Sequence, residues 1–216
     1  MSIPINLLKI KSTLPENLTL VAVSKTKPIP DLMEAYISGQ RIFGENKIQE
    51  MAEKWEAMPK DIEWHMIGHV QTNKVKFMAP FVSLIHGVDS LKLLEEINKQ
   101  AQKNNRIIDC LLQIYIAEEE SKFGLDEKEL DEILKQVQQQ EMKNIRIVGL
   151  MGMATFTENQ NQIKKEFTHL KSIFDQLTIH NPQFTILSMG MSGDYQLAIE
   201  CGSTMVRIGS SIFGSR

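Results

Sequence analysis

The sequence contains very little cysteine: among 216 residues only Cys110 and Cys201 occur, far apart in the chain. Each stands inside an apolar segment, and this placement predicts buried thiols. Such cysteine usage is typical of a reducing compartment and disfavours both a disulfide and a cysteine metal site.

Strong net charge and long apolar runs are also missing. The 24 basic and 27 acidic residues are interspersed and leave a formal net charge of -3, without the basic stripe that binds nucleic acid. The opening MSIPINLLKIKSTLP lacks the basic and apolar regions of a signal peptide, and no run approaches the length of a membrane span. We therefore expect a cytoplasmic protein with neither nucleic acid nor membrane as a partner.

Linkers, repeats and low-complexity tracts are absent, so we expect one domain over residues 1–216. Short apolar runs alternate with amphipathic ones, and several are apolar throughout, as in parallel strands buried on both faces. The strand candidates are 19–23, 41–43, 62–67, 82–85, 107–116, 145–151, 184–187 and 205–208. This alternation predicts an α/β fold, a compact (β/α)8 TIM-type barrel. A doubly wound open sheet has the same alternation and is the alternative.

Helix ends are recognisable between these strands. Pro30 and Asp31 open one helix, which Gly39 terminates. Asp126 with Glu129 forms a capping-box pair at the start of another. The apolar stripes that follow such starts are interpreted as core-facing surfaces of the helices.

Two loops predict a phosphate site. SMGMSGD (188–194) and RIGSSIFG (207–214) follow the last two strand candidates and contain small residues that let backbone N–H groups approach a phosphate closely. A single loop of this kind is usually only a turn. Two of them at the positions where barrels build phosphate sites form a more specific signal.

Two lysines stand where the first strand candidate ends. A lysine there, opposite a phosphate site, can form an imine with an aldehyde, and pyridoxal 5′-phosphate is the phosphate-bearing aldehyde that proteins hold in this way. Strand alternation places Val21, Val23 and Lys25 on one side, whereas Lys27 is already in the loop and is expected to be more solvated. Arg207 ends an apolar strand and is a candidate partner for the ring nitrogen.

The motifs AVSKTKP, FGENKIQE, WHMIGHVQTNK, GLMGM and SMGMSGDYQLAIECGSTMVRIGSSIFG occur in this order. Together they resemble the pyridoxal-phosphate homeostasis protein family, from about Leu20 to Phe213. The resemblance implies a barrel similar to the N-terminal domain of alanine racemase. It also implies pyridoxal 5′-phosphate as cofactor, held as an internal aldimine, and a role in cellular vitamin B6 and amino-acid homeostasis.

The resemblance also implies roles for particular residues. The imine lysine corresponds to Lys25 and the ring-nitrogen arginine to Arg207. The phosphate would be held at Ser192, Gly209 and Ser210, and the positions near the ring are Asn46 and His65. The chain departs from the family pattern at two positions, where Gly87 replaces the usual serine and Tyr115 a common asparagine, and its N-terminal helical region is shorter than usual.

Two other groups of residues are candidate sites. His65 and His69 have a spacing that would form a metal pair on a helix, but His65 lies on a predicted strand, so no metal is assigned. The acidic run 118–120 is interpreted as a solvated loop.

Two functions remain open. One is a protein that holds the cofactor and passes it to apo-enzymes; the other is a racemase-like enzyme. An arginine at the ring nitrogen keeps the ring unprotonated, and a racemase needs a second base, which alanine racemases take from another domain. The chain ends soon after the last loop, so we expect the carrier, with Tyr115 the residue on which an enzymatic interpretation depends. A barrel that binds another phosphorylated metabolite would leave Lys25 unexplained.

Overall fold

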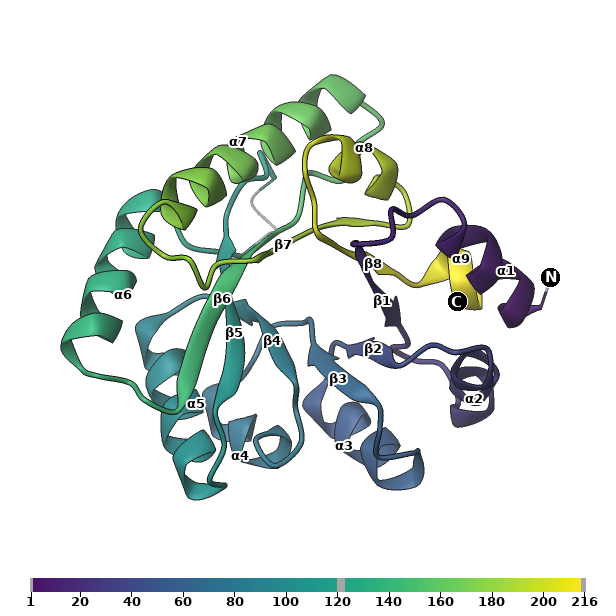
Figure 1. The fold of residues 1–216 in the computed structure, drawn as a ribbon, viewed down its shortest axis with the longest axis horizontal. Coiled ribbons are helices and arrows are strands. Elements are labelled where there is room, and N and C mark those ends of the chain that lie inside the picture. Colours follow the sequence, from purple (N-terminus) through teal and green to yellow (C-terminus); the bar gives the residue numbers. More distant parts are fainter. Residues whose placement is uncertain (1, 120–122, 215–216) are drawn as a thin grey trace.

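The protein is described by a computed structural model covering residues 2–119 and 123–214. Its strands form a closed parallel barrel in which each strand pairs with the next and β1 pairs with β8 (Figure 1). The strands are β1 Thr19–Val23, β2 Ile42–Glu45, β3 Glu63–Met66, β4 Leu84–Val88, β5 Ile108–Ile114, β6 Ile145–Gly152, β7 Ile186–Met191 and β8 Met205–Ile208. The predicted barrel is confirmed, and the open-sheet alternative is wrong.

Helices alternate with these strands and surround the barrel (Figure 1). They are α1 Ile3–Lys11, α2 Ile29–Ile37, α3 Ile48–Ala57, the 3-10 turn η1 Thr72–Lys74, α4 Val75–Met78, α5 Leu91–Lys103, α6 Glu127–Gln139, α7 Gln160–Thr178, α8 Tyr195–Glu200 and α9 Ser210–Phe213. In the described part of the chain, no helix combines the length and apolar character needed to cross a bilayer.

The predicted helix ends are confirmed. Pro30 lies in the first turn of α2, and Gly39 follows that helix with a φ of 88°, a left-handed conformation that glycine adopts without strain. Asp126 caps α6 in a complete capping box with Glu129. Local sequence signals therefore define where these helices begin and end.

The core has two layers separated by the barrel wall. Side chains from β1, β4, β5, β6 and β8 meet in an inner cluster that fills the barrel, namely Val21, Leu84, Leu111, Val148, Met151 and Met205. The larger cluster packs the other faces of the strands against the helices. Both faces of the sheet are buried, which explains why the strand candidates read as continuous apolar runs.

The cysteine prediction is only partly confirmed. Cys110 lies on β5 with a buried thiol, whose pKa is raised by burial. Cys201, which follows α8, is only half-buried. Neither cysteine is part of a disulfide.

Candidate functional site

A cavity of about 580 Å³ opens at the carboxyl ends of the strands. Six of the seven predicted site residues line this mouth cavity: Lys25, Asn46, Ser192, Arg207, Gly209 and Ser210. They come from segments that follow β1, β2 and β7, from β8 itself and from the start of α9. The barrel thus brings together residues that are up to 185 positions apart in the chain, from Lys25 to Ser210.

Strand alternation at β1 explains the position of Lys25. Val21 belongs to the inner core cluster, and Val23 and Lys25 line the mouth cavity above it. Ala22 and the buried Ser24 alternate with them, and Ala22 packs in the outer core cluster. The side predicted for Lys25 is therefore the side on which the structure places it.

Lys27 differs from the expectation. We expected a solvated loop lysine, but Lys27 is half-buried, lines the same cavity and donates from Nζ to the carbonyl oxygen of Phe213 at 3.2 Å. Both lysines are therefore within the candidate site. Only Lys25 continues the inward alternation of β1.

Arg207 is the most deeply buried cation that lines the cavity, and it is only 4% exposed. Its Nη1 donates to the carbonyl oxygen of Ser188 at 2.9 Å and to the Ser188 hydroxyl at 2.6 Å. Its Nη2 donates to the carbonyl oxygen of Gly152 at 3.1 Å. Burial lowers the pKa of Arg207 to about 10, against the opposing effect of the Asp194 carboxylate, so the guanidinium stays charged at neutral pH.

His65 does not line the mouth cavity, although it was predicted to lie near the ring. It is buried on β3, and its Nδ1 lies 3.0 Å from Nε2 of His86. Nδ1 of His86 in turn lies 3.1 Å from the hydroxyl of Ser188. His65 is thus connected to Arg207 through two intervening side chains. Burial lowers the pKa of His65 to about 3.

His65 and His69, the two histidines with the spacing of a helical metal pair, have different partners. His69 Nδ1 lies 3.2 Å from a carboxylate oxygen of Asp89, and its ring packs against Phe123. Within residues 2–119 and 123–214, no group of three or more His, Cys, Asp or Glu side chains is arranged to hold a metal ion.

The two glycine-serine loops contact each other at the cavity. The backbone N–H of Gly209 donates to the hydroxyl of Ser192 at 3.2 Å, and the N–H of Met191 donates to the carboxylate of Asp194 at 2.5 Å. A Cβ built at Gly209 would lie 3.0 Å from the carbonyl oxygen of Val23, so it would press on the end of β1. The two loops therefore meet at one edge of the cavity, which Ser192, Gly209 and Ser210 line.

Several lining residues were not singled out from the sequence. Met153 and Phe156 follow β6, and Asp194 directly precedes α8. Asp194 is mostly buried, and burial raises the pKa of its carboxyl group. Its place in SMGMSGD was a signal for it, whereas nothing in the sequence pattern marked Phe156, a residue that is 92% exposed.

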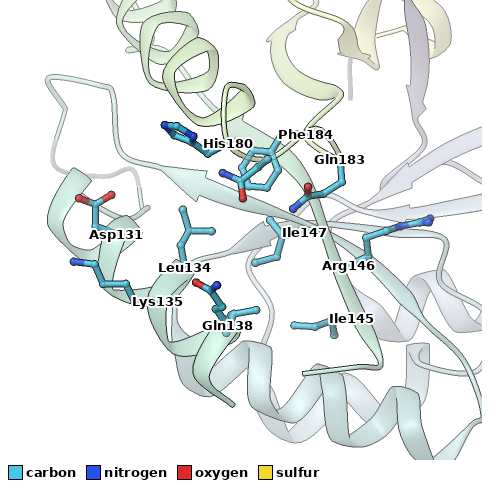
Figure 2. Close-up of a pocket in the computed structure, with 12 residues that line it drawn as sticks. Asp131, Leu134, Lys135, Gln138, Ile145, Arg146, Ile147, His180, Gln183 and Phe184 are labelled. Atoms are coloured by element: carbon cyan, nitrogen blue, oxygen red, sulfur yellow. The ribbon is translucent and has the colours of Figure 1, made fainter. Parts of the chain in front are cut away.

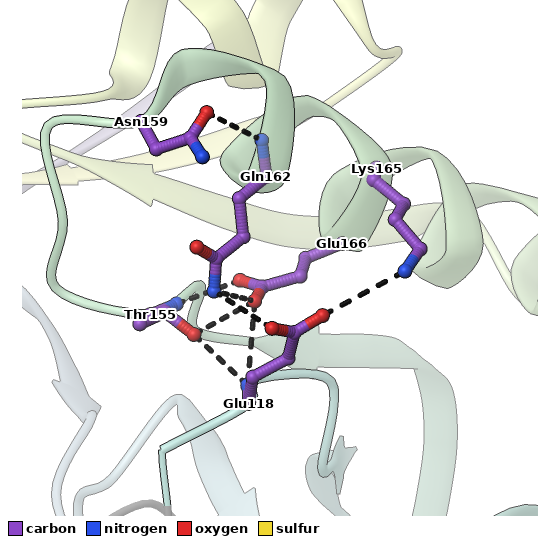
Figure 3. A network of polar contacts seen from close by, with 6 residues as sticks. All are labelled: Glu118, Thr155, Asn159, Gln162, Lys165 and Glu166. Atoms are coloured by element: carbon purple, nitrogen blue, oxygen red, sulfur yellow. Dashed lines mark hydrogen bonds and ion pairs between the residues drawn. The ribbon is translucent and has the colours of Figure 1, made fainter.

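The rim beside Phe156 is held by a polar network (Figure 3). The buried carboxylate of Glu166 on α7 accepts from the N–H and the hydroxyl of Thr155, both at 2.7 Å, and from the N–H of Glu118 at 3.3 Å. Glu166 therefore joins the loop after β5 to the loop after β6. We expected the acidic run 118–120 to be solvated. The Glu118 side chain is largely exposed, but its backbone N–H is part of this network. Glu120 lies outside the described residues.

The two departures from the family pattern have structural explanations. Tyr115 is not among the described residues that line the mouth cavity, and its hydroxyl donates to the carbonyl oxygen of Glu119 at 2.9 Å. In this structure the Tyr115 side chain is therefore bonded to the loop after β5 and does not line the cavity. A Cβ at Gly87 would lie 2.7 Å from the carbonyl oxygen of Gly68, so β4 packs too closely here for a side chain.

A larger cavity, of about 690 Å³, lies between α6, the start of β6 and residues 180–184 (Figure 2). Ile145 begins β6, so this cavity is at the end of the strand away from the mouth. Asp131 and Lys135 line it with opposite charges, and Arg146 is already paired with Asp109. None of the predicted site residues lines it, and we assign it no function.

The fold and the mouth cavity define a barrel of the alanine racemase N-terminal class, and the model of that domain family matches residues 2–216. The chain belongs to the pyridoxal phosphate homeostasis protein family. It is 40% identical to the member from Aquifex aeolicus, with 91% of this chain and 86% of that protein covered. It is 41% identical to the member from Schizosaccharomyces pombe, with 93% and 85% covered.

Solved structures extend the comparison. PipY of Synechococcus elongatus, solved with PLP bound, matches with a TM-score of 0.90 and 34% identity, covering 99% of this chain and 100% of that chain. Alanine racemase from E. faecalis matches with a TM-score of 0.77 and 18% identity. That match covers 99% of this chain and 58% of the racemase, and it establishes similarity of fold alone.

Proposed function

We propose that this protein binds pyridoxal 5′-phosphate in the mouth cavity and acts in cellular vitamin B6 and amino-acid homeostasis without efficient catalysis. The observation that carries the proposal is that Lys25 and Arg207 line one cavity together with both glycine-serine loops. The PLP-bound relative PipY, similar over nearly the whole chain, supports it.

The polar groups of the cavity fit this cofactor. All the hydrogen-bond acceptors that Arg207 contacts in the described structure are neutral, and they use three of its five N–H donors. The remaining donors suit a neutral acceptor such as a pyridine nitrogen. Because Arg207 stays charged, it donates a hydrogen bond and does not hand over a proton.

The phosphate group fits the edge formed by the two loops. Ser192, Gly209 and Ser210 line the cavity there, and the bond from the Gly209 N–H to the Ser192 hydroxyl holds two of these groups side by side. A phosphate can replace that bond and accept from several N–H and O–H groups at once. Asn46 lines the same cavity and is proposed to contact the ring side.

Lys25 supplies the covalent contact. Its amine would hold the cofactor by condensing with the aldehyde, with loss of water. Because water reverses this condensation, a lysine on an open barrel mouth suits a carrier that delivers the cofactor to apo-enzymes. The unbridged thiols of Cys110 and Cys201 fit a reducing compartment, and we place the protein in the cytoplasm as a single cofactor-binding unit over residues 1–216.

Efficient amino-acid chemistry is disfavoured by the same groups. A ring nitrogen that accepts from a guanidinium is not protonated, which weakens the electron sink that carbanion chemistry requires. A racemase also requires a second base. Tyr115, the candidate for that role, is held by the carbonyl oxygen of Glu119 and is not among the lining residues.

An absorption spectrum of the purified protein tests the proposal. Bound cofactor should give a visible band that borohydride removes, and peptide mapping of the reduced protein should find the pyridoxyl group on Lys25. A protein that neither absorbs in the visible nor takes up added pyridoxal 5′-phosphate would refute the proposed function.

A further inference from the structure

The two chain neighbours of Lys25 are both attached to one buried cluster behind the mouth cavity. The Ser24 hydroxyl donates to Oε1 of Glu45 at 2.6 Å. The backbone N–H of Thr26 donates to Oε1 of Glu50 at 2.6 Å. Glu45 ends β2 and Glu50 lies in the first turns of α3, so two elements hold the segment that carries Lys25.

Lys54 of α3 connects these contacts. Its Nζ donates to Glu45 Oε1 at 2.7 Å, to Glu50 Oε1 at 2.7 Å and to the carbonyl oxygen of Ser24 at 2.8 Å. An ammonium has three donors, and these three acceptors match them. Lys54 is 5% exposed and Glu45 is 0% exposed, so water competes little for these bonds. We call Glu45, Glu50 and Lys54 the clamp.

The backbone conformation that the clamp holds is an unfavourable one. Thr26 has a φ of 63°, in the left-handed region that a β-branched residue rarely adopts. Such a conformation persists only when the surrounding contacts determine it. The contact that Glu50 makes with the Thr26 N–H is one that a relaxed turn would lose.

We propose that the clamp positions Lys25, by holding Ser24 and Thr26 so that the side chain between them enters the mouth cavity. This inference rests on the proposed function in one respect, that Lys25 is the lysine that reacts. Glu45, Glu50 and Lys54 are absent from the cavity lining, and they act as positioning residues through the backbone on either side of Lys25.

A clamp with a purely structural role would affect stability and Lys25 reactivity differently from a clamp that positions Lys25. If the clamp only stabilised the contact of α3 with the barrel, weakening it would lower stability and leave the reactivity of Lys25 unchanged. If it positions Lys25, weakening it should slow imine formation in protein that remains folded. The two roles are therefore separable by measuring both quantities on one variant.

Glu50 is the best position for the test because its side chain is 23% exposed, so its removal should not prevent folding as loss of buried Lys54 or Glu45 would. Glu50→Ala removes the acceptor of the Thr26 N–H. Glu50→Gln keeps a side-chain oxygen that can accept this bond and is the conservative rescue. Glu53→Ala, at an exposed position of the same helix, is the matched control.

Two measurements are made on each cofactor-free variant: amide hydrogen exchange at Thr26 by NMR, and the rate at which added pyridoxal 5′-phosphate forms the imine band. We expect Glu50→Ala to speed Thr26 exchange about tenfold and to slow imine formation about fivefold or more. Glu50→Gln should stay within about twofold of the unchanged protein in both, as should Glu53→Ala. Faster exchange with an unchanged imine rate would overturn the proposal.

A third measurement separates this proposal from the proposed function. If the unchanged protein neither forms the imine nor takes up pyridoxal 5′-phosphate, the proposed function fails, and competitive acetylation of the cofactor-free protein still reports on Lys25. A change of about threefold or more in the rate of Lys25 relative to Lys27 in Glu50→Ala, absent in Glu53→Ala, would then support the clamp. An unchanged ratio would refute it.

Discussion

Arg207 donates to the hydroxyl of Ser188 at 2.6 Å, at one end of a buried chain of hydrogen bonds. Because Ser188 accepts this bond, its own proton is available to Nδ1 of His86, 3.1 Å away. In that arrangement His86 carries its proton on Nε2 and donates to Nδ1 of His65. The chain of hydrogen bonds is then complete with both imidazoles neutral.

The neutral histidines predict a loss of stability in acid. Burial lowers the pKa of His65 to about 3 and also lowers that of His86, below the ordinary 6.5. Between pH 6.5 and about 3 the unfolded chain binds protons at these sites while the native protein does not, so the free energy of unfolding falls as pH falls. The expected slope is about 1.4 kcal/mol per pH unit for each histidine.

Urea unfolding between pH 7 and pH 4.5 measures this slope. Burial raises the pKa of Glu45, so Glu45 changes the free energy of unfolding with pH in the opposite sense. The histidine contribution is therefore obtained by comparing variants with the unchanged protein. His65→Asn should reduce the slope by about 1.4 kcal/mol per pH unit. His180→Asn, at an exposed position, should leave it unchanged. Equal slopes in all three proteins would show that His65 is not held neutral.

The two lysines of the mouth give a second prediction. Lys25 continues the inward alternation of β1, whereas Lys27 donates to the carbonyl oxygen of Phe213. Lys25→Ala should lose the visible band of the bound cofactor and remain folded by circular dichroism, and Lys27→Ala should keep the band. A borohydride-reduced label found on Lys27 would contradict this assignment.

The phosphate loops give a third prediction. A Cβ added at Gly193 meets no atom within 4 Å, so Gly193→Ala should fold normally and yet obstruct a phosphate that approaches the loop. We expect its affinity for pyridoxal 5′-phosphate to fall about tenfold, with that for pyridoxal unchanged. The unchanged protein should also bind pyridoxal much more weakly than pyridoxal 5′-phosphate. Equal affinities for the two ligands, measured by titration of the absorption band, would rule out a phosphate site here.

Gly209 is a less suitable position for this test. A side chain there presses on Val23 at the end of β1, so Gly209→Ala would disturb the strand that carries Lys25 as well as the loop. Loss of binding in that variant would have two causes.

The rim network gives a fourth prediction. All the partners of the Glu166 carboxylate are donors, so Glu166→Gln would place an amide N–H against one of them. The expected loss is about 1–3 kcal/mol in the free energy of unfolding, measured in urea. Glu158→Gln, on the exposed loop nearby, is the control and should change it little. If Glu166→Gln left the free energy of unfolding unchanged, the two loops would not be joined through this carboxylate.

The sequence was sufficient for the features that depend on local pattern. Continuous apolar runs identified the strands, alternation along β1 gave the side on which Lys25 lies, and small residues marked the loops around Ser192 and Gly209. It failed where contacts cross the barrel. The residues around His65 do not indicate whether its side chain lines the mouth cavity or bonds to His86. The orientation of Tyr115 depends on the loop after β5, which Glu166 of α7 holds in place.

The choice between carrier and enzyme depends on Arg207 and Tyr115. Arg207 is charged and buried, so a ring nitrogen that accepted a hydrogen bond from it would stay unprotonated. Tyr115 is bonded to the carbonyl oxygen of Glu119 and does not line the cavity. We therefore expect little or no exchange of the α-hydrogen of alanine or other amino acids for deuterium. The cofactor should instead pass to an apo-enzyme that requires it.

Two assays on one preparation of the cofactor-loaded protein test this last prediction: α-hydrogen exchange followed by NMR, and recovery of activity by an apo-transaminase. Slow exchange with reactivation is the expected pair of results, because an imine at Lys25 would form reversibly and Tyr115 does not line the cavity as a second base would. The Lys25→Ala protein is the control for transfer, since it should retain little cofactor to deliver. Rapid exchange that disappears in Tyr115→Phe would instead make this protein a racemase-like enzyme, with the tyrosine moving into the mouth when substrate binds.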